Sequence, residues 1–127
     1  MRIYIASKYI EHRDKNRKIC ATLQKSGFEV FLPETIDVDA ITDEEMWYVG
    51  EACYNELVKC DVILVVAPVG LSVTCEIAYT IALKREMNKD MHIVVYGDIQ
   101  KREAMLQPYV DKTCYSTDEL IEYLQSL

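Results

Sequence analysis

Short apolar runs and helical stripes alternate along the chain. Residues 2–6 form a run of mostly aliphatic and aromatic side chains that predicts a first strand. Over residues 11–26 the apolar side chains recur three and four positions apart, and Gly27 follows as a residue that commonly ends a helix. A second strand is predicted over residues 28–32, and an acidic loop over Glu34 to Thr42.

The middle of the chain carries the strongest pattern. A helix is predicted from about Asp43, with one apolar stripe formed by Met46, Val49, Cys53, Leu57 and Cys60. Residues 61–68 are a nearly unbroken β-branched run, which is typical of a central strand covered on both faces. The next helix is predicted from Val73 to about Met87, with Ser72 as its N-cap.

Two strands and a helix are predicted in the remaining segment. His92 to Tyr96 is a β-branched run that predicts a fourth strand, and Gly97 opens the loop after it. A short fifth strand is predicted over Thr113 to Tyr115. Residues 116–119 have the Ser-x-x-Glu spacing of a capping box, which marks the start of a closing amphipathic helix.

This alternation, with no internal repeat or linker, predicts a single α/β domain over residues 1–127. We expect a flavodoxin-like, doubly wound parallel sheet of about five strands in the order 2-1-3-4-5, with helices on both faces. In such a sheet the ligand crevice forms where the carboxyl ends of the first and third strands separate. Functional residues are therefore expected near residues 7–10 and 67–76.

The charge composition limits the kinds of molecule that this protein can bind. The 127 residues carry 14 Lys and Arg against 21 Asp and Glu, a formal charge of −7, so no broad positive field is available to hold a nucleic acid polymer. A single mononucleotide stays possible, because a few backbone amides suffice for one phosphate. The first eight residues are too short an apolar run for a signal peptide and no 18-residue apolar stretch follows, so we expect a cytoplasmic protein without membrane contact.

The cysteine and histidine content argues against structural disulfide bonds and metal sites. Five cysteines without a C-x-x-C pair, together with two histidines, fit neither a disulfide framework nor a metal site, and no cofactor is expected. At least four of the five thiols are expected to be buried and reduced. The chain also lacks the glycine-rich motifs of phosphate-binding P-loops and dinucleotide sites, and the G-x-S-x-G of serine hydrolases.

The candidate chemistry lies in residues 69–76, a loop that turns directly into a helix. Gly70 allows a close approach of the backbone, and Ser72 with the first free amides of the helix can hold a phosphate or carboxylate. Glu76 lies one turn further on. The helix dipole alone would explain a carboxylate there, but its position beside the buried face and toward the crevice also suits a nucleophile or general base.

Three segments carry a resemblance to a known family: Ile3–Ser7, Cys60–Val66 and Gly70–Tyr79. Together they resemble the nucleoside 2-deoxyribosyltransferase superfamily, particularly its 2′-deoxynucleoside 5′-phosphate N-hydrolase branch, over roughly residues 2–97. The resemblance implies a nucleoside deoxyribosyltransferase-like domain. It also implies a homodimer or larger homo-oligomer that acts on a small-molecule nucleoside or nucleotide.

The resemblance implies roles for particular residues. Glu76 matches the glutamate that attacks C1′ of the sugar, and Tyr4 matches the tyrosine that assists it. The aspartate that serves as the second acid lies eight residues before the aspartate of the third strand, which in this chain is Cys53. A thiol is a weak proton donor for a departing base, and Glu51 and Glu56 are candidates to replace it.

Seven residues are candidates for binding substrate. The resemblance implies that the loop before the glutamate binds the ribose and, as in the hydrolases of the family, the 5′-phosphate. Lys8 suits a phosphate, and Tyr9 and Trp47 suit a base. Lys8 and Tyr9 are equally explained as solvated loop residues. The seven are Ser7, Lys8, Tyr9, Trp47, Gly70, Leu71 and Ser72.

Three functions are left open by the sequence. The leading one is cleavage or transfer of the N-glycosidic bond of a (deoxy)nucleoside or its 5′-monophosphate, with Glu76 as nucleophile. A catalytically silent nucleotide-binding or sensing module is the alternative. It is favoured by two departures from the family, Cys53 in place of the acid and Gly70 in place of the aspartate that the transferases have six residues before the glutamate. A Toll/interleukin-receptor-like NAD glycohydrolase is the third, because that family has a similar sheet order and a Cys-then-Glu helix.

Overall fold

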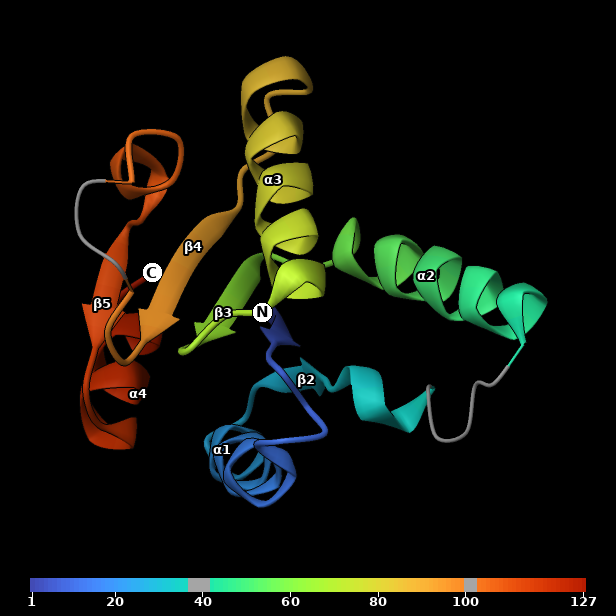
Figure 1. Cartoon of the computed structure of the whole chain (residues 1–127). Helices are drawn as coiled ribbons and strands as arrows, with labels where there is room; N and C mark the ends of the chain where they lie inside the picture. The colour runs from blue at the N-terminus through green and yellow to red at the C-terminus, as the bar shows by residue number, and fades with distance from the viewer. Residues whose placement is uncertain (37–41, 100–102) are drawn as a thin grey trace.

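Five parallel strands form one sheet in the order β2-β1-β3-β4-β5. The computed structural model describes residues 1–36, 42–99 and 103–127 (Figure 1). The predicted flavodoxin-like order is therefore confirmed. The strands are β1 (Arg2–Ala6), β2 (Glu29–Phe31), β3 (Val62–Val66), β4 (His92–Tyr96) and β5 (Lys112–Cys114).

Helices cover both faces of the sheet, as predicted (Figure 1). One face packs Ile3, Ile5 and Leu64 against α1 and α4, and the other packs Tyr4, Ile63 and Val65 against α2 and α3. All five residues of β3 are buried, which explains their unbroken apolar run. The helices are α1 (Arg13–Lys25), α2 (Asp43–Leu57), α3 (Leu71–Glu86) and α4 (Thr117–Gln125), with short 3₁₀ turns η1 (Pro33–Thr35) and η2 (Gln107–Tyr109).

The start of α3 differs from the prediction. The helix begins at Leu71 with Gly70 as its N-cap, so the prediction that Ser72 caps it is wrong. The carbonyl oxygen of Gly70 already accepts the amide of Thr74 at 3.0 Å and the hydroxyl of Thr74 at 2.9 Å. Because glycine has no side chain to cap the helix, the amides of the first turn are left without an internal acceptor.

The start of α4 confirms the predicted cap with one change. The Ser116 hydroxyl accepts the Glu119 amide at 3.2 Å, but the Glu119 carboxylate reaches back to the amide of Tyr115 rather than to that of Ser116. The predicted acidic loop begins as η1, and its residues 37–41 lie outside the described residues.

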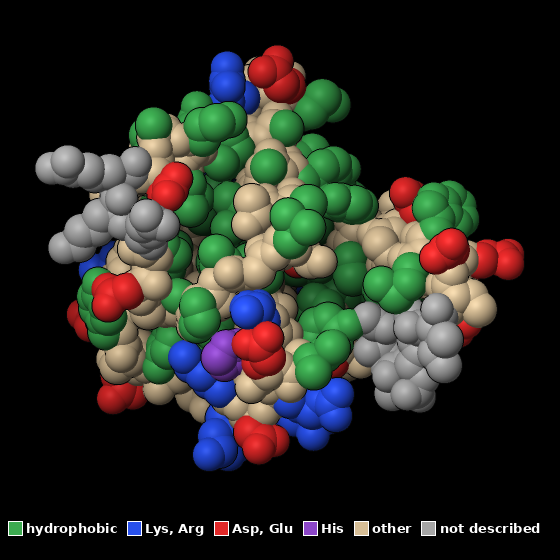
Figure 2. Space-filling model, in the orientation of Figure 1, with side chains coloured by type: hydrophobic (Ala, Val, Ile, Leu, Met, Phe, Trp, Pro, Cys, Tyr) green, Lys and Arg blue, Asp and Glu red, His purple; other side chains and the backbone are tan. Residues whose placement is uncertain are grey.

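Helix α2 projects from the body of the domain (Figure 1). Of its 15 residues only Leu57 is buried, and Met46 and Trp47 near its start are 52% and 70% exposed. The predicted apolar stripe is therefore buried only at its carboxyl end, because few of the described residues pack against the rest of the helix. Figure 2 shows hydrophobic side chains gathered over α3 and the exposed end of α2.

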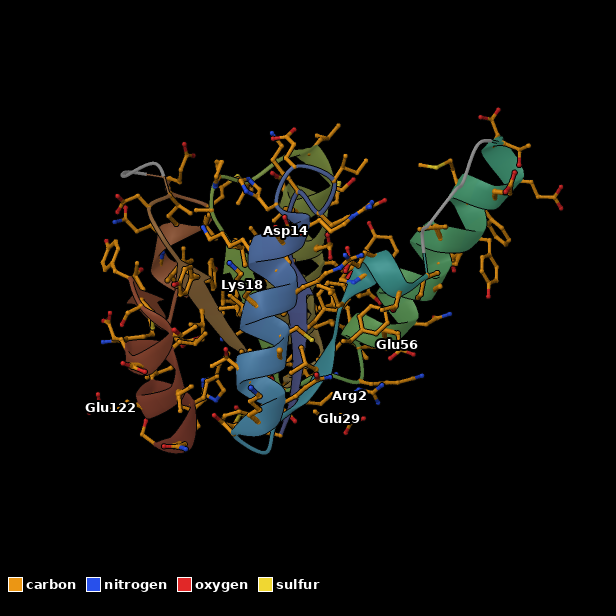
Figure 3. The ribbon with its side chains drawn as sticks, turned by 90° about the horizontal axis from the view of Figure 1, so that it is seen from below. Arg2, Asp14, Lys18, Glu29, Glu56 and Glu122 are labelled. Atoms are coloured by element: carbon orange, nitrogen blue, oxygen red, sulfur yellow. The ribbon has the colours of Figure 1, made fainter. Side chains whose placement is uncertain are left out.

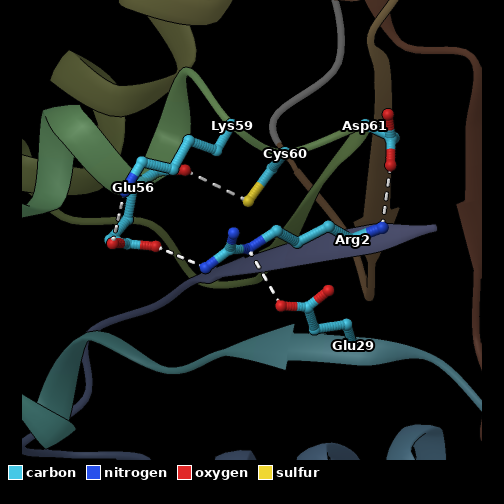
Figure 4. A network of polar contacts seen from close by, with 6 residues as sticks. All are labelled: Arg2, Glu29, Glu56, Lys59, Cys60 and Asp61. Atoms are coloured by element: carbon cyan, nitrogen blue, oxygen red, sulfur yellow. Dashed lines mark hydrogen bonds and ion pairs between the residues drawn. The ribbon is translucent and has the colours of Figure 1, made fainter.

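An ion-pair network ties the amino ends of the strands together (Figure 4). The Arg2 guanidinium lies 2.7 Å from the Glu56 carboxylate and 3.6 Å from that of Glu29, and the Arg2 amide donates to the Asp61 carboxylate at 2.8 Å. The side chains of Arg2, Glu29 and Glu56 lie together at this edge (Figure 3). The network joins β1 and β2 to the end of α2 and the start of β3, opposite the edge at which the crevice is expected.

All five cysteines are free thiols. Cys60 and Cys114 are buried, Cys20 and Cys53 are half-buried, and Cys75 is exposed on α3. The expectation of at least four buried thiols is therefore wrong, since the outer sides of the helices bear cysteines too. Within the described residues, no three His, Cys, Asp or Glu side chains are placed to hold a metal ion, and no helix is long and apolar enough to cross a membrane.

Candidate active site

A cavity opens at the carboxyl ends of β1 and β3, where the topology predicts the crevice. Its volume is about 300 Å³, and it lies between the loop after β1 and the first turn of α3. The structure thus brings together six of the seven predicted binding residues. The lining residues are Ser7, Lys8, Tyr9, Ile10, Glu11, Gly70, Leu71, Ser72 and Val73.

The cavity offers groups that suit an oxyanion. Ser7 is only 7% exposed, and its hydroxyl oxygen is buried without a hydrogen-bond partner among the described residues. The uncapped amides of α3 lie on the other side, where the helix dipole favours negative charge. The Lys8 ammonium adds a positive charge and pairs with the Glu11 carboxylate at 3.3 Å.

Glu76 lies one helical turn beyond the cavity lining, on the side of α3 that faces the sheet and α2. Its Oε2 atom is buried, and within the described residues it has no hydrogen-bond partner and Glu76 takes part in no ion pair. Burial raises the pKa of the Glu76 carboxyl to about 7, and the nearby Tyr4 hydroxyl lowers it by a smaller amount. Near neutral pH this carboxyl is therefore present in both the ionised and the protonated form.

The Tyr4 hydroxyl is the group that lies near the Glu76 carboxyl. It is fully buried on β1, and its pKa is raised above the ordinary value first by burial, then by the charge of Glu76 and by Cys53. The phenol therefore stays protonated and can act as a donor. The Tyr4 and Glu76 groups are near enough to shift each other's pKa, yet in the described part of the chain neither Tyr4 Oη nor Glu76 Oε2 has a hydrogen bond of regular geometry.

Helix α2 contributes the other wall of this site. Cys53, half-buried on α2, lies near enough to the Tyr4 hydroxyl to raise its pKa. The position that the family resemblance gives to an acid therefore does lie beside Tyr4, although it carries a thiol. The sequence analysis missed its neighbour Tyr54, whose ring centroid lies 4.8 Å from that of Tyr79 on α3.

Tyr54 belongs to the same electrostatic environment. Burial is the largest cause that raises the pKa of the Tyr54 hydroxyl, and the nearby Cys75 and Glu76 raise it further. No motif marks this residue in the sequence, because it lies beside the apolar stripe of α2 rather than on it. Its position directly after Cys53 is the one signal that could have pointed to it.

Three predicted candidates lie apart from these groups. Glu56 is held by Arg2 at the opposite edge of the sheet, so it cannot replace the acid missing at Cys53. Glu51 is exposed on α2, where its charge reaches Tyr54. Trp47 is 70% exposed and does not line the cavity, so its contact with a base stays a prediction.

A larger cavity of about 600 Å³ lies between α3 and residues that follow β4, among them Ile99, Met105 and Leu106. Aliphatic side chains such as Ile81 and Leu106 form much of its wall, and it contains neither Glu76 nor any predicted binding residue. Such a lining is less suited to a sugar or a phosphate than the smaller cavity with its hydroxyl, amides and lysine. We therefore place the candidate site at the carboxyl ends of β1 and β3.

This chain is similar to known proteins in its three-dimensional structure, but not in its sequence. No family model and no curated protein matches the sequence. The 2-deoxyribosyltransferase of the psychrotolerant bacterium Bacillus psychrosaccharolyticus matches with a TM-score of 0.75 at 14% identity, over 97% of this chain and 92% of that one. The CMP N-glycosidase of Clostridium botulinum matches with a TM-score of 0.62 at 13% identity, over the whole of both chains.

A conserved protein from Enterococcus faecalis V583 matches with a TM-score of 0.69 at 13% identity, over 99% of this chain and 98% of that chain. At these identities the likeness shows a shared fold. It agrees with the fold expected from the family resemblance and does not single out the 5′-phosphate N-hydrolase branch.

Proposed function

We propose that this protein cleaves or transfers the N-glycosidic bond of a nucleoside or nucleotide, with Glu76 as the nucleophile. The observation that carries the proposal is the Glu76 carboxyl itself, with an unpaired buried oxygen and a pKa of about 7, beside the protonated Tyr4 hydroxyl. Two proteins of the same fold are named for chemistry on this kind of bond, which supports the proposal.

The reaction follows from the chemistry of the bond. Breaking the C1′–N bond builds positive charge on the sugar, which a carboxylate beneath C1′ stabilises. Glu76 forms an ester bond to C1′ as the bonding electron pair leaves with the base. Water or a second base then attacks C1′ and frees the Glu76 carboxylate. The Tyr4 hydroxyl donates toward Glu76 and fixes its orientation.

Protonation of the departing base is the step for which the site offers the weakest candidate residue. Cys53 lies where the acid is implied, and a thiol is a poor proton donor at neutral pH. This same observation favours the second candidate function, a module that binds a nucleotide without turnover. Base release from nucleosides and their 5′-monophosphates separates the two functions, since the silent module is stabilised thermally by these compounds but releases no base.

Replacing Cys53 by Asp is expected to raise kcat for base release by at least about tenfold, because a positioned acid contributes 10²- to 10⁴-fold in such reactions. Cys53→Ser is the matched control, with a side chain of similar size and no acid. Initial rates with purine substrates at neutral pH give the comparison. Equal rates for the Asp and Ser variants would show that position 53 does not serve the leaving group.

The assay that tests the proposal is chromatographic detection of free base from a panel of ribo- and deoxynucleosides and their 5′-monophosphates. We expect release from at least one member of the panel, with loss of that release in Glu76→Gln. NAD is included in the panel, and release of nicotinamide with no other base would favour the Toll/interleukin-receptor-like alternative.

A further inference from the structure

The cavity of about 600 Å³ between α3 and the segment after β4 has no part in the proposed function. Its volume lies within the range of small-molecule sites, about 300–1,000 Å³. It shares no lining residue with the cavity at Ser7. Hydrophobic side chains gather over α3, the helix that forms one of its walls (Figure 2). The cavity is therefore a candidate for a second binding site.

The cavity is long and apolar along α3. Thr74 in the first turns of the helix and Arg85 in the last turn both line it, which corresponds to about 16 Å along the helix axis. The α3 residues that line the cavity between these two have no polar side-chain atoms: Ile77, Ala78, Ile81 and Ala82. Across from them, Ile99 and Leu106 form an aliphatic wall. Such a space suits an extended hydrocarbon chain better than a sugar or a phosphate.

The charges at the rim of this cavity favour a cation. Arg85, Glu86 and Glu103 line it, and within the described residues none of the three takes part in an ion pair. Arg85 and Glu86 are adjacent in the sequence and offset each other's charge, which leaves the exposed carboxylate of Glu103 on the other wall. The formal charge of −7 on the whole chain adds a general attraction for cations.

We propose that this cavity binds a hydrophobic amine, with its alkyl chain between α3 and Leu106 and its ammonium group beside Glu103. The chain leaves water for an aliphatic surface, which is the main source of affinity. The ammonium group stays at the exposed rim and keeps much of its hydration, as the head of a lysine side chain does at an apolar surface. This site goes beyond the proposed function and does not depend on it.

Calorimetry with small amphiphiles on the full chain tests the inference. Hexylamine, hexanol and hexanoate have the same chain with a positive, a neutral and a negative head group, and methylamine has the positive charge without the chain. We expect hexylamine to bind tightest and hexanoate weakest, and methylamine to show no measurable binding. Each methylene from butylamine to hexylamine should tighten binding by up to about fourfold, since the added group is buried.

Two variants test the two parts of the site. Ala82→Phe fills the cavity from an exposed helical position and should weaken hexylamine binding about tenfold or more, while Ala21→Phe, exposed on α1 at the other face of the sheet, should not. Glu103→Gln should weaken hexylamine binding by up to about fivefold and leave hexanol binding unchanged. Glu122→Gln on α4 is its matched control (Figure 3).

Hexanoate that binds as tightly as hexylamine, or equal hexylamine affinity in the Ala82 and Ala21 variants, would overturn the inference. If Ala82→Phe does not fold, the comparison of Glu103→Gln with Glu122→Gln decides, and equal hexylamine affinity in these two variants would refute the role of Glu103. A dimer seen by analytical ultracentrifugation that is lost in Ala82→Phe, without amine binding in the wild type, would show that a second copy covers the cavity instead.

Discussion

Replacing Glu76 by Gln is expected to lower kcat for base release by at least about a thousandfold, which is a modest loss for a removed nucleophile. Glutamine preserves the size of the side chain and removes both the negative charge and the reactive oxygen. None of the ion pairs within the described residues involves Glu76, so the loss would not come from breaking a structural salt bridge. Chromatography of the released base over long incubations measures the residual rate.

Glu86→Gln is the matched control for this variant. Glu86 is the last residue of the same helix and is exposed, so the same chemical change is made far from Tyr4 and Cys53. The control should keep the wild-type rate. If Glu76→Gln released base as fast as Glu86→Gln does, the nucleophile would have to be another group.

The activity is expected to rise steeply with pH up to neutrality. Only the ionised carboxyl of Glu76 can attack C1′, and burial raises its pKa to about 7. The value of kcat/KM should therefore increase about tenfold per pH unit below pH 7 and level off above it. A profile that is flat between pH 5 and pH 8 would contradict the assignment of the raised pKa to the reacting group.

The stability of the protein should fall with rising pH over the range in which its activity rises, because both depend on ionisation of Glu76. Because the pKa is raised in the folded state, from 4.5 to about 7, folding favours the protonated carboxyl, and this contribution is lost as pH rises through 7. Glu76→Gln should therefore unfold with a free energy up to about 3 kcal/mol higher than the wild type at pH 8, and with a similar one at pH 4. Urea unfolding at both pH values measures the difference. The same gap at both values would contradict the raised pKa.

The sheet was predictable from local patterns. The run over His92–Tyr96 is a strand with those same bounds, and the unbroken run of β3 is buried on both faces. Strand-helix alternation then leaves few topologies, and the observed order is the one it favours. The cavity could also be placed, because the topology alone locates the carboxyl ends of β1 and β3.

The parts that could not be predicted depend on contacts between distant segments. The sequence does not show that Met46 and Trp47 on α2 are exposed, because the spacing of apolar residues along a helix is the same whether or not other elements pack against them. Nor does it show that Tyr54 approaches Glu76, or that Glu56 is held by Arg2 at the far edge. The homo-oligomer implied by the family resemblance and a cytoplasmic location stay predictions.

Mass spectrometry of the protein quenched in acid during turnover, followed by peptide mapping, identifies the residue that forms the covalent bond to the sugar. If Glu76 is the nucleophile, the peptide that contains it carries an adduct with the mass of the substrate sugar, with its phosphate if present, and the Glu76→Gln variant carries none. A sugar adduct on another residue, formed equally well by the Glu76 variant, would contradict this assignment.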